Sequence, residues 1–185
     1  MKLKYSPLLV ILFFGIYLVS SFFSVTKNPT RNVLSVQETS APQTPDVYSV
    51  VKVVDGDTID ILVNGKKERM RIIGINSPET VDPRRPVECF GKEASDYAKK
   101  LLLSKTVKLK SDPTQADKDK YGRLLRYIYL PDGTDFGLVM IQEGYAYEYT
   151  YDVPYQHQAE YKKAQIEAEN GRKGLWSDTS CSRKK

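Results

Sequence analysis

The stretch RIIGINSPET, residues 71–80, combines residue types that can handle a phosphate group. Its isoleucines predict a strand, and its proline ends that strand because proline has no N–H to donate to a sheet. Arg71 then lies on the strand, whereas Asn76, Ser77 and Glu79 lie at the strand-to-loop junction. A guanidinium, a carboxylate and neutral oxygen ligands at one end of a sheet are a common basis for a phosphate-handling site.

Residues of these types near a strand end more often form an ordinary exposed turn, so the interpretation depends on two further segments. Residues 54–58 read VDGDT, and residues 119–123 read DKYGR. With these motifs in order, and with Leu-Trp-Ser at residues 175–177, the chain resembles the staphylococcal nuclease (thermonuclease) family over residues 48–177. The resemblance implies an OB-fold and Ca²⁺-dependent hydrolysis of DNA and RNA, with little sequence preference and with 3′-phosphate ends.

The resemblance also implies a role for each motif residue. The expected metal ligands are two side chains and one main-chain carbonyl, from Asp57, Asn76 and Ser77. The expected catalytic residues are two arginines that stabilise the transition state and a proposed general base, namely Arg71, Arg123 and Glu79. The expected substrate-binding residues are Lys120, Tyr121, Tyr149 and Tyr151, of which the last two match the family only after a one-residue gap.

These residues also suit phosphodiester cleavage on chemical grounds. Cleavage requires neutralisation of charge on the phosphoryl oxygens, a positioned and activated water, and stabilisation of the leaving alkoxide. A hard divalent cation held by oxygen ligands can neutralise that charge, and guanidinium groups add bidentate hydrogen bonds. Glu79 is the carboxylate available to act on the water.

Asn76 departs from the family pattern, which commonly has Asp at this position. Its amide oxygen can still bind Ca²⁺, but one negative charge is lost, and the number of charged ligands tunes Ca²⁺ affinity. We therefore expect Ca²⁺ binding in roughly the millimolar range. Asn76 also keeps open an alternative function, a catalytically silent OB-type module that binds nucleic acid.

The composition excludes other kinds of active site. The chain has one histidine and two cysteines, which excludes a zinc site of the Cys/His type and leaves His157 as the sole base for a Ser-His-Asp triad. The formal net charge of +5 permits a polyanionic substrate without requiring one. Cys89 and Cys181 form either a disulfide, in an oxidising compartment, or two free thiols.

The N-terminal region predicts export. Residues 7–25 are almost entirely apolar and long enough to approach the thickness of a bilayer core, and lysines precede them. Residues 1–26 are therefore a signal anchor, which we favour, or a cleaved signal peptide, and residues 27–46 are a flexible linker. We expect an extracytoplasmic monomer, tethered to the membrane by this segment, with a catalytic domain at 47–180 and a basic tail at 181–185.

The hydrophobic pattern predicts the α+β class, with a five-stranded OB-fold β-barrel and about three packed helices. Three strands form a meander, and two more follow a helix; the five ranges are 50–54, 58–63, 68–75, a short strand around 107–109, and 124–130. The helices are expected at 92–104, 135–143 and from His157 to about Gly171. Residues 112–120 are expected to form a mobile polar loop, and the alternating tyrosines of 145–151 fit a half-buried strand.

Overall fold

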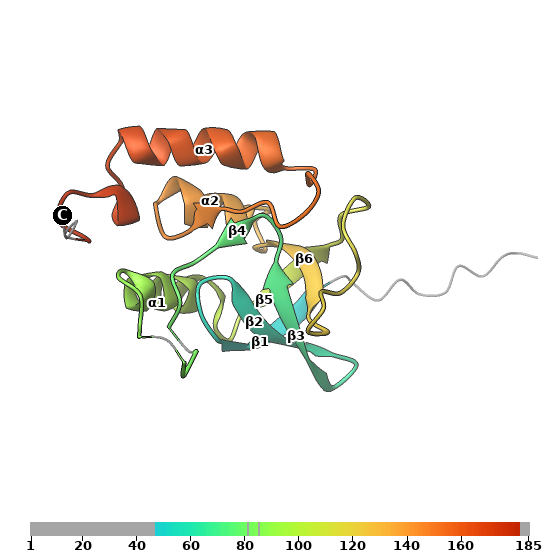
Figure 1. Cartoon of the computed structure of the whole chain (residues 1–185). Coiled ribbons are helices and arrows are strands. Elements are labelled where there is room, and N and C mark those ends of the chain that lie inside the picture. Colours follow the sequence, from blue (N-terminus) through green and yellow to red (C-terminus); the bar gives the residue numbers. More distant parts are fainter. Residues whose placement is uncertain (1–46, 81, 85, 182–185) are drawn as a thin grey trace, which may run out of the picture. The chain divides into compact units, whose positions relative to one another are not determined.

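A closed five-stranded barrel forms the centre of the described part of the chain, which comprises residues 47–80, 82–84 and 86–181 of a computed structural model. Its strands are β1 (Val47–Val53), β2 (Thr58–Val63), β3 (Lys66–Ile72), β5 (Thr106–Lys110) and β6 (Leu124–Tyr129). They are hydrogen-bonded in the order β1-β2-β3-β6-β5, and the parallel pair β3–β6 and the antiparallel pair β1–β5 close the barrel (Figure 1). The predicted OB-fold barrel is confirmed.

The described residues also contain three helices, as predicted, of which the first two contact the barrel and the third packs on the second. They are α1 (Gly91–Leu102), α2 (Phe136–Gln142) and α3 (Gln158–Asn170), followed by a single 3₁₀ turn, η1 (Gly174–Trp176). Asp135 caps α2, because its carboxylate accepts a hydrogen bond from the Leu138 N–H at 3.1 Å. Helices α2 and α3 lie side by side, and α1 contacts the barrel at β1 (Figure 1).

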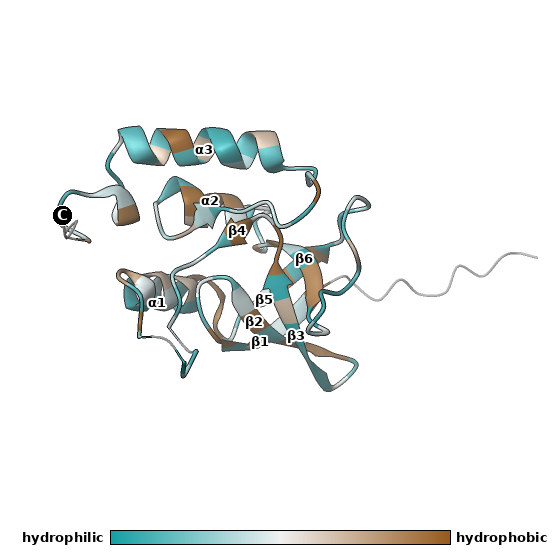
Figure 2. Ribbon diagram, viewed as in Figure 1, coloured by the Kyte–Doolittle hydropathy of each residue, from teal (hydrophilic) through white to brown (hydrophobic). Residues whose placement is uncertain are grey.

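Apolar side chains at alternating strand positions fill the barrel interior. Fully buried residues include Ile59, Ile61, Met70, Ile72 and Ile128. Helix α3 is mostly hydrophilic (Figure 2), and its buried residues Tyr161, Ala164 and Ala168 form a narrow stripe along one face. Helix α3 therefore covers the core with one face and exposes the others.

The prediction of a third continuous strand over residues 68–75 is wrong. It is interrupted after β3 and resumes as β4 (Ile75–Asn76), which pairs with another short strand, β7 (Tyr147–Glu148). Gly74 makes the interruption possible, because its φ of +82° is accessible to glycine at little cost. A Cβ at this position would also lie 2.6 Å from the Tyr155 ring. The residues of the first motif thus come from two sheets.

The tyrosine-rich segment also differs from the prediction. Only Tyr147 and Glu148 are in a strand, and the expected longer strand over 145–151 is wrong. The Tyr149 N–H still donates to the carbonyl of Gly74 at 2.9 Å, but the residues that follow are in no strand. Tyr149 and Tyr151 are exposed, whereas Tyr145 and Tyr147 are half-buried.

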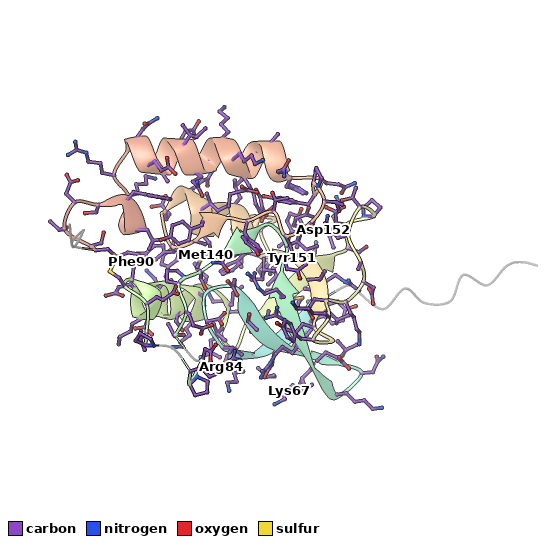
Figure 3. The ribbon with its side chains drawn as sticks, viewed as in Figure 1. Lys67, Arg84, Phe90, Met140, Tyr151 and Asp152 are labelled. Atoms are coloured by element: carbon purple, nitrogen blue, oxygen red, sulfur yellow. A yellow bond between two sulfur atoms is a disulfide. The ribbon has the colours of Figure 1, made fainter. Side chains whose placement is uncertain are left out.

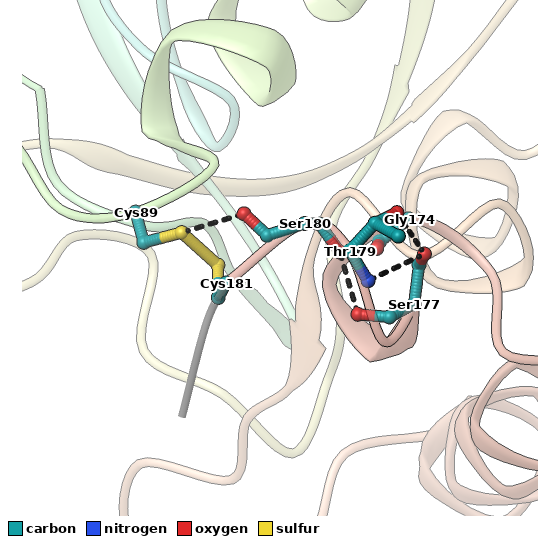
Figure 4. Close-up of a disulfide and its surroundings, with 6 residues drawn as sticks. All are labelled: Cys89, Gly174, Ser177, Thr179, Ser180 and Cys181. Carbon is teal, nitrogen blue, oxygen red and sulfur yellow. Dashed lines mark hydrogen bonds between the residues drawn. A yellow bond between two sulfur atoms is a disulfide. The ribbon is translucent and has the colours of Figure 1, made fainter. Parts of the chain in front are cut away.

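A disulfide joins Cys89, just before α1, to Cys181, near the end of the described chain (Figure 4). The two residues are 92 positions apart, and their Cα atoms are 5.9 Å apart. The bond therefore connects the segment that leads into α1 with the segment that follows η1.

The predicted signal segment 1–26, the linker 27–46 and most of the tail 181–185 lie outside the described residues. Within 47–80, 82–84 and 86–181, none of the helices is long and apolar enough to cross a membrane. The domain boundaries remain predictions.

Candidate active site

One pocket of about 660 Å³ contains every residue that the sequence nominated for catalysis, metal binding or substrate binding. These residues come from the position directly before β2, from β3, from β4 and the turn that follows it, and from two loops. The ten residues are Asp57, Arg71, Asn76, Ser77, Glu79, Lys120, Tyr121, Arg123, Tyr149 and Tyr151. His157 and the two cysteines are not among the residues that line it. The closure of the barrel therefore gathers three motifs that are distant in sequence.

Asp57 connects the two sheets that contribute to the pocket. Its Oδ1 accepts a hydrogen bond from the Thr58 hydroxyl at 2.9 Å, and its Oδ2 accepts one from the Ser77 N–H at 2.7 Å. The same Oδ2 forms an ion pair with the Arg71 guanidinium at 3.1 Å. Asp57 is only 5% exposed, so these partners hold a buried carboxylate in one orientation.

Four oxygen atoms fix the guanidinium of Arg71. One terminal nitrogen donates to the carbonyls of Ile72 and Ile75, at 3.0 and 2.7 Å. The other donates to Oδ1 of Asn76 at 3.1 Å and pairs with Asp57. A planar guanidinium satisfies such a set of acceptors, whereas an ammonium presents donors in a different geometry. Arg71 is thus a preorganised cation on the pocket wall.

Asp55 lines the pocket and was missed, because only Asp57 of its motif was nominated from the sequence. Its Oδ1 accepts a hydrogen bond from the Asp57 N–H at 3.0 Å. Burial, and then the charge of Asp57, raise the pKa of Asp55 to about 7. The signal in the sequence was a second carboxylate two residues before a proposed metal ligand.

The donor set around Asp57 suits a hard divalent cation. It comprises the carboxylates of Asp55 and Asp57, the amide oxygen of Asn76 and the carbonyl of Ser77, all of which line the pocket. Two close carboxylates, one with a raised pKa, create a site where a bound cation would offset their repulsion. No group of three or more His, Cys, Asp or Glu residues suited to a metal occurs in the described chain, so the set depends on neutral oxygens.

Glu79 is held by its own segment of chain. Its Oε1 accepts hydrogen bonds from the N–H groups of Thr80, at 2.8 Å, and Asp82, at 3.1 Å. Its main-chain N–H donates to Oε2 of Glu88 at 3.0 Å, and its carbonyl accepts from the Glu88 N–H at 2.9 Å. Glu88 also lines the pocket and was missed, because nothing in the sequence links it to a residue nine positions earlier.

Asp119 organises the loop that carries Arg123. Its Oδ1 accepts the N–H groups of Tyr121 and Arg123, both at 2.9 Å, and its Oδ2 accepts the Arg123 Nε–H at 2.6 Å. Burial alone would raise the pKa of Asp119, but these hydrogen bonds outweigh it and hold the pKa below its ordinary value. Asp119 is therefore a charged partner that orients the second arginine.

Aromatic rings and a lysine form the exposed rim of the pocket. Tyr121 is 73% exposed and Tyr151 is 69% exposed. The Lys120 Nζ lies 5.2 Å from the Tyr121 ring and 5.9 Å from the Tyr151 ring. Figure 3 marks Tyr151 and its neighbour Asp152 on the segment after β7. Exposed rings beside a cation are suited to stacking on bases next to a phosphate backbone.

The loop 112–120 completes the rim and is tied down by hydrogen bonds. Thr114 and Gln115 donate to the carbonyls of Pro154 and Val153, at 3.0 and 3.2 Å. At the base of the loop, the buried Asp112 accepts hydrogen bonds from the Tyr127 hydroxyl and from the Gln156 N–H. The segment has neither helix nor regular strand, as expected, and these bonds give it a defined position against residues 153–156.

His157 lies away from the pocket, as expected for a packed histidine. Its Nδ1 is 3.9 Å from a carboxylate oxygen of Asp135 and 3.6 Å from one of Glu160. Its ring lies 4.4 Å from the Tyr127 ring, measured between centroids.

The fold and pocket together define an OB-fold protein in which arginines, carboxylates and exposed tyrosines line one pocket. Residues 69–178 match the family model for staphylococcal nuclease homologues. The thermonuclease of Staphylococcus hyicus is 40% identical over 131 residues, which cover 71% of this chain and 76% of that protein. Endonuclease YncB of Bacillus subtilis (strain 168) is 32% identical over 147 residues, which cover 76% of this chain and 69% of that protein. The chain belongs to the staphylococcal nuclease family.

Proposed function

We propose that this protein is an exported, Ca²⁺-dependent nuclease that hydrolyses DNA and RNA with little sequence specificity and leaves 3′-phosphate ends. The observation that carries the proposal is the meeting of two arginines, a carboxylate and oxygen donors in one pocket. The nuclease names of the relatives agree with this chemistry.

The substrate phosphate would bind between the two arginines. Arg71 is held by main-chain carbonyls and Arg123 by Asp119, so both guanidinium groups are oriented before the substrate arrives. Their two positive charges would offset the negative charge that grows on the phosphoryl oxygens in the transition state. Lys120 and the rim tyrosines would bind the neighbouring nucleotides by charge and stacking.

Glu79 would act as general base on the attacking water. Two N–H groups hold its Oε1, so the carboxylate has a fixed direction. Asp55, Asp57, Asn76 and the Ser77 carbonyl would hold Ca²⁺. When bound, the ion supplies Lewis-acid neutralisation of phosphoryl charge. With Asn76 among the ligands, Ca²⁺ affinity in roughly the millimolar range is expected.

The location outside the cytoplasm is supported by two features. Residues 7–25 have the composition of a signal anchor or signal peptide. The disulfide between Cys89 and Cys181 is of a kind that persists in oxidising compartments. The protein would act there as a monomer, tethered to the membrane or released after cleavage of the segment.

The test is digestion of plasmid DNA and of RNA by the full-length protein in detergent, with millimolar Ca²⁺ and with chelator. We expect cleavage only with Ca²⁺, and products that require a phosphatase before 3′-end labelling. Glu79→Gln should abolish most of the activity, whereas Glu93→Gln, an exposed residue of α1 outside the pocket, should not. Binding of nucleic acid without cleavage would instead favour the alternative, a catalytically silent OB-type module, for which Asn76 is the argument.

A further inference from the structure

The segment between β4 and α1 carries Glu79 but has no regular structure of its own. Among its described residues, Ser77–Thr80, 82–84 and 86–90, there is neither helix nor strand. Figure 3 marks Arg84 in its middle and Phe90 at its end, directly before α1. A chain of this kind is held in place by its side-chain contacts and covalent links rather than by a backbone ladder.

Glu79 and Glu88 form the contact that closes this segment on itself. The Glu88 N–H donates to the Glu79 carbonyl at 2.9 Å, and the Glu88 carboxylate accepts the Glu79 N–H at 3.0 Å. The Glu79 carboxylate in turn accepts two N–H groups from the same segment. The position of Glu88 therefore sets the main chain of Glu79 and, through it, the direction of the carboxylate.

Glu88 is held from the far side by the disulfide. Cys89 is its direct neighbour and is bonded to Cys181 (Figure 4). The segment before Cys181 is fixed to the body of the protein, because Leu175 is buried and its N–H donates to the Gly144 carbonyl at 2.8 Å. The Ser180 hydroxyl adds bonds to the carbonyls of Gly174 and Ser177.

Non-covalent contacts would keep the segment folded without this link. The Phe90 ring stacks on Tyr145 with centroids 5.4 Å apart, and Tyr145 stacks on Tyr97 of α1 at 4.1 Å. The Gly91 N–H also donates to the Glu88 carbonyl at 3.0 Å. Loss of the disulfide should therefore loosen Glu88 without unfolding the barrel.

We propose that the Cys89–Cys181 disulfide and Glu88 together position Glu79 for catalysis. The inference rests on the proposed function, because it takes Glu79 as the general base. Small displacements of a catalytic group have large effects on rate, so loss of the link should lower kcat by about five- to tenfold. KM should change less than twofold, because neither cysteine lines the substrate pocket.

The test compares kcat and KM of Cys181→Ser in two backgrounds, wild-type and Glu79→Gln. Cys181→Ser breaks the bond at the end remote from the segment, so no residue of the segment is altered. We expect the five- to tenfold loss of kcat in the wild-type background and less than a twofold loss with Glu79→Gln, where no base remains to be positioned. An equal loss in both backgrounds, or no loss in either, would overturn the proposal.

Glu88 gives a second, independent variant. Glu88→Ala removes the acceptor for the Glu79 N–H and should reproduce the loss of kcat. Glu88→Gln keeps an acceptor oxygen and should retain most of the wild-type kcat. A reducing agent should lower the activity of the wild-type protein and should not change the activity of Cys181→Ser. Equal activity of Glu88→Ala and wild-type would overturn the role of Glu88.

Amide hydrogen exchange separates this inference from the proposed function. Peptides covering 78–90 should exchange faster in Cys181→Ser than in the wild-type protein, whereas peptides of β2 and β3 should not change. Equal exchange overturns the proposal, with or without cleavage by the wild-type protein. If exchange is faster in Cys181→Ser but the wild-type protein cleaves no nucleic acid, the link between the disulfide and the segment 78–90 is supported. The proposed function is then overturned, and with it the role of the disulfide in catalysis.

Discussion

Gly74 separates β3 from β4, and the substitution Gly74→Ala tests how tightly that junction is built. Its φ is +82°, so alanine pays a cost of about 1–2 kcal/mol in this left-handed region. The same substitution restricts the unfolded chain, which returns about 0.4–1 kcal/mol. The backbone contribution is therefore a net loss of about 0.5–1 kcal/mol.

Packing adds a larger cost at this position. A Cβ would lie 2.6 and 2.7 Å from two ring atoms of Tyr155, and 2.9 Å from Tyr161. Both rings are buried, so neither can move into solvent. Overpacking of this kind costs about 1–3 kcal/mol. We expect Gly74→Ala to lower the free energy of unfolding by about 1.5–4 kcal/mol in total.

Gly65→Ala is the matched control. Gly65 also has a positive φ, +75°, but no heavy atom lies within 4 Å of a Cβ built on it. It should therefore show the backbone contribution alone, about 0.5–1 kcal/mol. Urea denaturation of both variants, read by far-UV circular dichroism, gives the difference directly. Equal losses for the two variants would refute the argument that the tyrosines pack closely against Gly74.

Two further predictions concern the pocket, and a third concerns Asp112 at the base of the loop 112–120. Arg71→Lys keeps the charge but loses the planar guanidinium that four acceptors fix, so kcat should fall about 10²–10³-fold. The control Arg69→Lys, on the same strand, should keep kcat within twofold of the wild-type value. A loss of kcat below threefold for Arg71→Lys would contradict the role of Arg71. Asn76→Asp adds a charged ligand and should lower the Kd for Ca²⁺ about tenfold in calorimetric titration; an unchanged Kd would show that residue 76 does not bind the ion. Asp112 has a pKa below its ordinary 3.8, since its hydrogen bonds outweigh the opposing effect of burial. The stability that its carboxylate contributes is therefore present above pH 3.8 and lost as the pH falls through the lowered pKa. Asp112→Asn should have a lower free energy of unfolding in urea than the wild-type protein at pH 7, and the difference between the two free energies should become smaller below pH 3.8. A difference in free energy that does not change with pH would contradict this assignment.

The sequence alone was enough to predict the barrel and its helices, because the local signals are strong. Alternating isoleucines mark β2, Asn64 and Gly65 form a hairpin turn with φ of +50° and +75°, and Asp135 caps α2. The three motifs are also short and continuous in sequence, so their resemblance to the family nominated the residues that line the pocket.

Only the tertiary structure decided what those residues contact. The break at Gly74 depends on the Tyr155 and Tyr161 rings, which come from segments about eighty residues later. The raised pKa of Asp55 results from burial, which no local pattern encodes, and the clamp of Glu88 on Glu79 depends on the path of an irregular segment. The sequence left the cysteines as either a disulfide or free thiols, because a bond across 92 positions requires two distant segments of the chain to meet in space. Local chemistry thus identified the reactive groups, and long-range packing determined how they are held.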